Sequence, residues 1–205
     1  MCTVKVNFLQ KESNQTIMHE PIKIKLTVSE IRVAAQVGVA RKLSSMEKNL
    51  NQNESYNYQK AWDYDINGAA AELAFCKWKG IHWSASVDNF TGADVGDDIQ
   101  IRNAQKDDGS LAIKEHDQND HVFVLLTGRI PEFTLRGWIR GKDGKKPHWK
   151  SNINKGQDTW LVPQEALRKI PERNGKQAPR QSPRQTPRQT PRQYQKGTQQ
   201  YYGTT

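Results

Sequence analysis

The segment GADVGDDIQIR, residues 92–102, combines residue types that can hold a metal ion with the alternation of a β-strand. Along such a strand Asp98, Gln100 and Arg102 would share one face, while the isoleucines between them anchor the other face in the core. The two glycines of the segment would let the chain fold Asp94 back toward the polar face. The sequence therefore predicts a cluster of polar and charged side chains at this strand.

A further carboxylate, Glu72, lies in the middle of an expected helix over residues 67–79, NGAAAELAFCKWK. The residues three and four positions away are glycine, alanine, phenylalanine and cysteine, so an intrahelical salt bridge is excluded. Glu72 therefore either faces solvent or meets a partner from another segment. Its small, apolar neighbours favour an inward-facing carboxylate that a cation or a metal neutralises.

Carboxylate and amide oxygens of this kind suit a hard divalent cation, Mg²⁺ or Mn²⁺, with Glu72, Asp94 and Asp98 as its ligands. Such a cation can activate water and stabilise charge on a phosphate, and a nearby Lys or Arg can balance that charge. Phosphodiester hydrolysis is the reaction that fits this inventory. The alternative is an Asp-rich turn that enters an amphipathic strand with a solvated polar face.

The segments that must position these residues begin with two alternating stretches, residues 4–9 and 22–28, which predict a β-hairpin. A helix should begin near Thr27, because Thr27 and Glu30 have the spacing of a capping box. The next predicted helix, which carries Glu72, would be capped by Asp65 or Asn67 and end at Gly80. Cys76 in that helix is expected to be buried; the two cysteines of the chain are far apart and form no CxxC motif.

The second half of the chain is rich in short β-branched and aromatic runs separated by turns, which predicts a succession of antiparallel strands. The run 121–127 is apolar almost throughout and suits a central strand buried on both faces. Pro163 marks the start of a terminal helix after a short strand. The expected fold is α/β, a central mixed, largely antiparallel sheet flanked by helices in one domain of residues 1–172. The five predicted strands of this half cover residues 81–87, 98–102, 110–115, 121–127 and 133–140.

The order of these segments, a helix glutamate followed by strands with an aspartate and a Gln-x-Arg element, resembles the PD-(D/E)XK nuclease superfamily, in particular its resolvase-like members. The stretch from GAAAELAF through ADVGDDIQIR to LRGWIRG is also similar to an uncharacterised phage-encoded group. The resemblance implies a restriction-endonuclease-like fold and a magnesium-dependent nuclease that processes phage DNA.

By this resemblance Glu72 is the helix carboxylate, Asp94 or Asp98 is the metal-binding aspartate, and Gln100 with Arg102 replaces the acid-x-lysine pair. A second alignment pairs Asp98 with Lys114 on the next strand. Gln100 and Arg102 depart from the usual acidic residue and lysine, and the spacing between Asp94 and Gln100 is short for the superfamily.

The 205-residue chain carries a formal net charge of +9, and residues 173–205 supply seven of these charges without any acidic residue. This tail repeats a four-residue PRQ(S/T/Y) unit, which predicts a disordered, polyproline-like extension. It either keeps the protein in solution or serves as an electrostatic arm for nucleic acid or a protein partner. In the nucleic-acid interpretation its phosphate-binding residues are Arg180, Arg184, Arg188 and Arg192.

Within the body, the basic segment RGKDGKKPHWK, residues 140–150, is interpreted as a glycine-rich hairpin tip. Its lysines Lys142, Lys145 and Lys146 are candidates for phosphate contacts, although many such loops are only solvated. The histidines have no ligand spacing, so a zinc site is not expected.

Two functions of different class follow from the sequence. One is a metal-dependent nuclease that acts on DNA, and the other is a catalytically silent nucleic-acid- or protein-binding module of the same fold. No segment has the roughly 20 apolar residues that a membrane span requires, and no charged leader precedes an apolar run. We expect a cytoplasmic protein, in the host cytoplasm if it is phage-encoded, and the sequence leaves a homodimer open.

Overall fold

In the computed structural model the described residues are 21–48, 58–87, 92–151 and 158–170. Every described residue lies in one compact unit, Met1–Arg173. The predicted strand over residues 4–9, and with it the predicted hairpin, lies outside the described residues, as does the basic tail.

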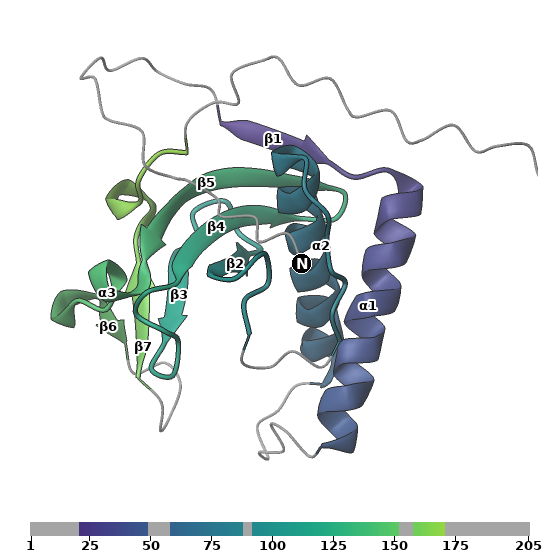
Figure 1. Ribbon diagram of the computed structural model, residues 1–205, viewed down its shortest axis with the longest axis horizontal. Helices are drawn as coiled ribbons and strands as arrows, with labels where there is room; N and C mark the ends of the chain where they lie inside the picture. Colours follow the sequence, from purple (N-terminus) through teal and green to yellow (C-terminus); the bar gives the residue numbers. More distant parts are fainter. Residues whose placement is uncertain (1–20, 49–57, 88–91, 152–157, 171–205) are drawn as a thin grey trace, which may run out of the picture. The chain divides into compact units, whose positions relative to one another are not determined.

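Two long helices, α1 (Val28–Glu47) and α2 (Tyr58–Lys79), lie side by side next to the sheet (Figure 1). The predicted capping box begins α1: the Glu30 N–H donates to Thr27 Oγ1 at 3.3 Å, and the Thr27 N–H donates to Glu30 Oε2 at 2.6 Å. These bonds satisfy amide groups that have no partner inside the first turn. The predicted start of this helix is therefore confirmed.

Helix α2 begins at Tyr58, so the prediction that Asp65 or Asn67 caps its start is wrong. Asn67 lies inside the helix, is buried, and accepts a hydrogen bond from the Ile130 N–H at 3.0 Å. Its polar side chain therefore serves a tertiary contact with the sheet instead of a helix end. The C-terminal end is as predicted, because Gly80 follows with a φ of 72°, a left-handed conformation that favours glycine.

The strands form two sheets, which confirms the α/β class with a mixed, largely antiparallel sheet. The first sheet has the order β1-β5-β4-β2, in which only the β2–β4 pair is parallel. The second, antiparallel sheet has the order β3-β7-β6. The bounds are β1 Ile22–Lys25, β2 Ile99–Ala104, β3 Leu111–Lys114, β4 Val122–Arg129, β5 Glu132–Arg140, β6 Lys150–Ser151 and β7 Thr159–Val162.

The predicted succession of antiparallel strands is wrong at β2, β3 and β4. Strand β3, which follows β2 in the chain, belongs to the second sheet. The chain then re-enters the first sheet at the end where β2 began, so β4 runs parallel to β2. The prediction that 121–127 is buried on both faces is confirmed, since residues 121–127 are all buried. Val124 belongs to the core beneath the helices, and Leu125 belongs to the second core under the smaller sheet.

Three local predictions need correction. Residues 81–87 form no strand: Trp83 is buried in the main core, so its segment is anchored to the helices without joining a sheet. The segment 140–150 is not a hairpin tip, because α3 (Gly141–Gly144) and the 3-10 turn η1 (Pro147–Trp149) separate β5 from β6. The terminal helix after Pro163 is a single 3-10 turn, η2 (Gln164–Ala166).

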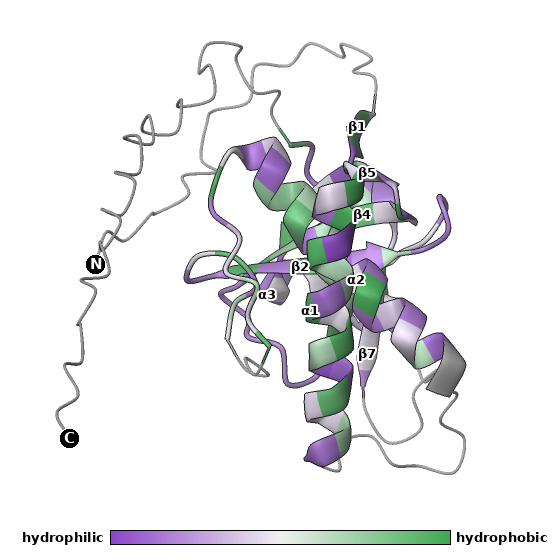
Figure 2. Cartoon of the chain, turned by 90° about the vertical axis from the view of Figure 1, so that its right-hand side faces the viewer, coloured by the Kyte–Doolittle hydropathy of each residue, from purple (hydrophilic) through white to green (hydrophobic). Residues whose placement is uncertain are grey.

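Apolar residues also occur on the outer side of α1. Val28, Leu43 and Met46 are exposed there, and Figure 2, which faces this side, shows hydrophobic positions among hydrophilic ones along the helix. Within the described residues, no helix combines the length and the apolar character that crossing a membrane would require.

Candidate functional site

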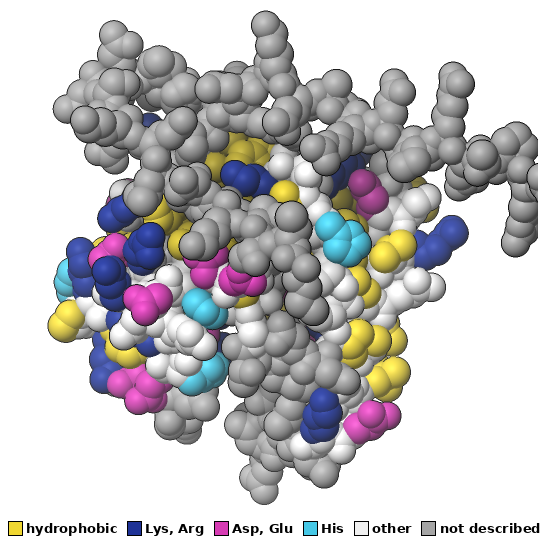
Figure 3. Space-filling model, viewed as in Figure 1, with side chains coloured by type: hydrophobic (Ala, Val, Ile, Leu, Met, Phe, Trp, Pro, Cys, Tyr) yellow, Lys and Arg dark blue, Asp and Glu magenta, His cyan; other side chains and the backbone are white. Residues whose placement is uncertain are grey.

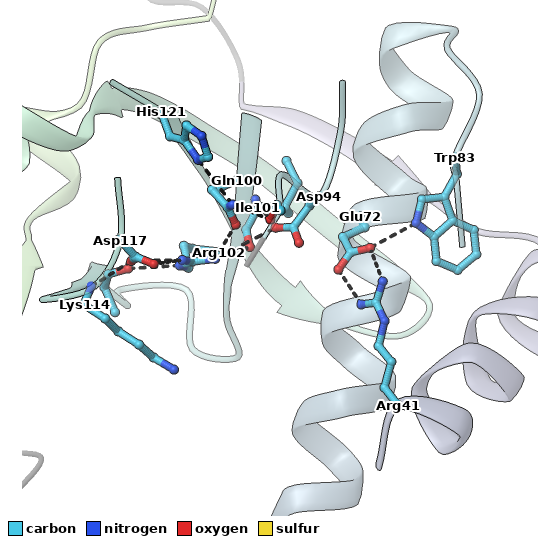
Figure 4. Close-up of polar contacts among 12 residues, drawn as sticks. Arg41, Glu72, Trp83, Asp94, Gln100, Ile101, Arg102, Lys114, Asp117 and His121 are labelled. Atoms are coloured by element: carbon cyan, nitrogen blue, oxygen red, sulfur yellow. Dashed lines mark hydrogen bonds and ion pairs between the residues drawn. The ribbon is translucent and has the colours of Figure 1, made fainter. Parts of the chain in front are cut away.

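The Glu72 carboxylate is buried on α2 and paired with a cation from α1. Its two oxygens accept hydrogen bonds from the Arg41 guanidinium at 2.5 and 2.8 Å, and Oε2 accepts a third from the Trp83 indole N–H at 3.0 Å. Arg41 Nε also donates to the Ser86 carbonyl at 2.8 Å, which fixes the segment after α2. Figure 4 shows the Arg41 and Trp83 side chains directed at the Glu72 carboxylate. Glu72 was expected either to face solvent or to meet a partner from another segment. The structure shows the second case, since Glu72 is buried and pairs with Arg41 of α1.

The Asp94 carboxylate folds back onto β2, as the glycines of this segment suggested. Asp94 Oδ2 accepts the Ile101 N–H at 2.7 Å, and the Asp94 N–H donates to the Ile99 carbonyl at 3.0 Å. The intervening turn includes Gly96 with a φ of 61°, which an L side chain rarely adopts. The Asp94 side chain thus lies between β2 and the Glu72 side chain (Figure 4).

Burial raises the pKa of Asp94 to about 6, and the negative charge of Glu72 contributes to this rise. The hydrogen bond from the Ile101 N–H and the positive charges of Arg102 and Arg41 act in the opposite direction without cancelling it. Asp94 is therefore a carboxylate whose charged form is only partly compensated by the protein. Glu72, by contrast, has a bidentate guanidinium.

Gln100 and Arg102 share one face of β2, as predicted from strand alternation. The Gln100 amide nitrogen donates to the Gly92 carbonyl at 2.9 Å and lies 3.4 Å from His121 Nδ1, and the Gln100 side chain is buried. Arg102 Nη2 forms a bidentate pair with the Asp117 carboxylate at 2.9 and 3.0 Å. Asp117 lies in the loop between β3 and β4, residues 115–121, which we call the Asp117 loop. This loop holds the Arg102 guanidinium next to Gln100 (Figure 4).

Three oxygen atoms from different groups converge on Nη1 of Arg102. Gln100 Oε1 lies 3.3 Å away, the Ile101 carbonyl oxygen 3.4 Å and Asp94 Oδ2 3.9 Å. An acidic, an amide and a main-chain oxygen around one cationic nitrogen form a donor set of the kind that a hard cation uses. This point is the centre of the candidate site.

The structure does not bring Asp98 and Lys114 into this cluster. Asp98 is exposed on the turn before β2, and within the described chain no hydrogen bond or ion pair joins its carboxylate to Glu72, Asp94 or Gln100. Lys114 is exposed on β3, and only its main-chain N–H approaches the site, where it donates to Asp117 Oδ2 at 2.8 Å. In Figure 4 no dashed line joins the Lys114 ammonium to Arg102 or to another residue drawn there.

Among the described residues, no three His, Cys, Asp or Glu side chains are grouped so that they could hold a metal ion. The expected ligand set of Glu72, Asp94 and Asp98 is thus not assembled as such. Asp94 remains, and the other oxygens that converge with it are the neutral ones of Gln100 and Ile101. A divalent cation here would have to retain several of its water ligands, which is the usual behaviour of Mg²⁺.

The predicted phosphate-binding lysines divide into two kinds. Lys142 and Lys146 are exposed, whereas the Lys145 ammonium donates to the Glu115 and Asp117 carbonyls at 3.0 and 2.6 Å. Lys145 therefore holds the Asp117 loop instead of facing solvent. The tail residues Arg180, Arg184, Arg188 and Arg192 lie outside the described residues.

Sequence reasoning missed Arg41 and Asp117, which neutralise Glu72 and Arg102 respectively. Asp117 follows β3 in a polar turn, and nothing local distinguishes it from the other acidic residues nearby. For Arg41 a signal did exist: a glutamate among small helix residues requires a cation, and α1 is the preceding helix.

Comparison with known proteins gave no match, whether with family models, with curated proteins or with solved structures. The function of the site must therefore be inferred from its residues and their geometry.

Proposed function

We propose that this protein is a metal-dependent nuclease that hydrolyses phosphodiester bonds in DNA, with Mg²⁺ or Mn²⁺ held by Asp94, Gln100 and the Ile101 carbonyl. The observation that carries the proposal is the convergence of these three oxygens on one cationic nitrogen, at 3.3 to 3.9 Å. The Arg102 Nη1 nitrogen places positive charge at that point, which supports a site where a bound metal would take the place of this nitrogen.

The donor set supports a hard divalent cation, because all three donors are oxygens and only one is charged. When bound, the metal would lower the pKa of a water molecule and stabilise negative charge on the phosphate. Asp94 would supply the formal charge, while Gln100 and Ile101 fix the direction of approach. Gln100 is itself held by the Gly92 carbonyl and His121, which limits its rotation.

Arg102 would bind the phosphate that undergoes attack. Asp117 holds the Nη2 end of its guanidinium by two hydrogen bonds. The Nη1 end could then leave the oxygens of Asp94, Gln100 and Ile101 and bind a phosphate oxygen. A guanidinium near a phosphate in transfer stabilises the growing negative charge. Arg41 and Glu72 would act as a neutral pair that supports Asp94 without contacting the substrate.

A catalytically silent nucleic-acid- or protein-binding module is the second candidate. It is favoured by the full pairing of Glu72 with Arg41 and of Arg102 with Asp117, since a carboxylate already bonded twice to a guanidinium is a poor metal ligand. In the nuclease, Asp94 and Gln100 would bind a metal in place of Arg102 Nη1. In the silent module they would keep their contacts with Arg102.

Cleavage of plasmid DNA and of single-stranded circular DNA by the full chain, with Mg²⁺ or Mn²⁺ and separately with EDTA, tests the proposal. We expect metal-dependent nicking that Asp94→Asn abolishes. The matched control is Asp98→Asn, which removes an aspartate four positions later that lies outside the cluster, and it should retain activity. Nicking that survives Asp94→Asn, or no nicking with either metal, would contradict the nuclease proposal.

A further inference from the structure

A cavity of about 430 Å³ lies on the opposite side of β5 from α2, where β5, η1 and η2 meet the α3 turn. Cavities of roughly 300–1,000 Å³ are typical of small-molecule sites. The residues that line it combine an aromatic ring, two cations, one acid and an apolar floor: Ile139, Asp143, Lys146, Trp149, Ala166 and Arg168.

Trp149 is the aromatic residue that lines this cavity. The Trp149 side chain packs against the second core and is half-exposed. The ammonium of the exposed Lys146 lies over the Trp149 ring, 5.1 Å from the ring centre. On the cavity lining, Arg168 is half-exposed and approaches the Asp143 carboxylate at 3.4 Å. The cavity therefore presents an aromatic ring with a lysine ammonium over its face, and a base that stacks on this ring would displace the ammonium toward a flanking phosphate.

Positive charge also continues around this cavity. Lys142 and Lys169 are exposed, and Lys150 is exposed but pairs with Asp158 at 2.5 Å. Figure 3 shows Lys and Arg side chains, with some Asp and Glu among them, on the side where Figure 1 places α3. A ligand that carries several anionic groups in a row would therefore meet several cations.

We infer that this cavity binds an unpaired nucleotide of a single DNA strand, with the base stacked on Trp149 and the flanking phosphates on Lys146 and Arg168. Aromatic side chains that alternate with cations are the usual means of binding single strands. A duplex would not fit in this way, because its base faces are covered by their neighbours in the stack. Asp143 can accept a hydrogen bond from an amino or imino group of the base edge.

The cavity is connected to the candidate active site through one loop. Lys145, the neighbour of Lys146, donates to the Asp117 carbonyl at 2.6 Å, and the Asp117 carboxylate holds Arg102. A strand seated on Trp149 would thus lie beside the loop that positions the phosphate-binding Arg102. The inference rests on the proposed function for nucleic acid as the ligand and deepens it, because it makes single-stranded DNA the preferred substrate.

The test measures binding of a labelled thymidine oligonucleotide of about ten residues, within the roughly 4–16 nucleotides of a single-strand site, to the full chain in EDTA. A duplex of the same length is measured in parallel. We expect the single strand to bind more tightly, and Trp149→Leu to weaken its binding by about 5- to 150-fold, the range for loss of one base stack. Trp149→Phe, which keeps an aromatic face, should retain most of the affinity.

Lys146→Gln should weaken single-strand binding modestly and lower its salt slope by about 0.7, the value for one phosphate contact. Lys25→Gln, at an exposed lysine of β1 in the same unit, is the matched control and should change neither quantity. Because EDTA prevents cleavage, a protein that binds the single strand but never cuts DNA refutes only the nuclease proposal.

Three results would overturn the inference. One is equal affinity for single strand and duplex, which would show electrostatic binding alone. Another is single-strand affinity unchanged in a folded Trp149→Leu variant, as judged by its melting curve. The third is displacement of the oligonucleotide by inorganic phosphate or polyglutamate at equal charge concentration, which would show a site for anions or acidic proteins without base stacking.

Discussion

Two carboxylates lie next to each other in this protein, one on α2 and one before β2, and the protein treats them differently. Glu72 receives two hydrogen bonds from Arg41 and one from Trp83, so its charge is neutralised inside the fold. Asp94 receives a single main-chain hydrogen bond, and its nearest guanidinium nitrogen on Arg102 is 3.9 Å away. Glu72 is thus held in an ion pair that builds the structure, whereas the nuclease proposal requires Asp94 to be available for a ligand.

Removal of Arg41 should have the largest effect on stability, because it leaves the Glu72 carboxylate buried without a cation. We expect Arg41→Met to lower the free energy of unfolding by about 3–5 kcal/mol, measured by urea denaturation near neutral pH. The double variant Arg41→Met, Glu72→Met should recover most of this loss, since apolar replacement of a whole buried pair is often neutral. A loss below about 1 kcal/mol in the single variant would show that Glu72 does not depend on Arg41.

The second prediction concerns Asp94, whose replacement should raise the free energy of unfolding instead of lowering it. Its folded pKa of about 6 lies above the ordinary value of 3.8, so ionisation of Asp94 lowers stability as the pH rises through this window. Asp94→Asn should therefore stabilise the protein above about pH 6, by at most roughly 3 kcal/mol, because Asn can still accept the Ile101 N–H.

The stabilisation by Asp94→Asn should shrink as the pH falls from about 6 to 3.8 and vanish below that range, where the wild-type carboxyl is protonated in both the folded and the unfolded state. Urea denaturation of wild type and variant across this range measures the difference. If the variant is less stable than wild type at pH 7.5, Asp94 is a structural residue like Glu72, and the contrast between the two carboxylates fails.

The third prediction concerns the helix contact that allows Arg41 to reach Glu72. A Cβ on Gly38 of α1 would lie 2.5 Å from the Ile66 Cα of α2, so Gly38→Ala should force the helices apart. We expect a loss of about 1–3 kcal/mol. Gly68→Ala on α2 is the matched control, because its Cβ would meet no atom within 4 Å, and it should gain up to about 1 kcal/mol in thermal or urea unfolding. Equal effects of the two substitutions would exclude a tight contact at Gly38.

Features that depend on neighbouring residues could be predicted from the sequence. The capping box of Thr27 and Glu30, the end of α2 at Gly80 and the burial of the run 121–127 all follow from local residue types. So does the shared face of Gln100 and Arg102, which strand alternation alone dictates.

Features that depend on distant residues could not be predicted. Arg41 and Glu72 are 31 positions apart, and only the packing of α1 on α2 makes them partners. The parallel β2–β4 pair depends on β3 leaving for a second sheet, which no local pattern indicates. The early start of α2 at Tyr58 was missed because its first turn lacks an acidic residue and the polar Asp65 and Asn67 resemble caps.

The most direct test of the account is the effect of a divalent cation on the melting temperature. A ligand that binds the folded state raises its apparent stability by mass action, so Mn²⁺ in large excess over its dissociation constant should raise the melting temperature of the full chain at pH 7.5. We expect this rise to be lost in Asp94→Asn, strongly reduced in Gln100→Leu and unchanged in Asp98→Asn. The absence of any rise in the wild-type protein, or an equal rise in Asp94→Asn, would contradict the claim that Asp94, Gln100 and Ile101 form a cation site.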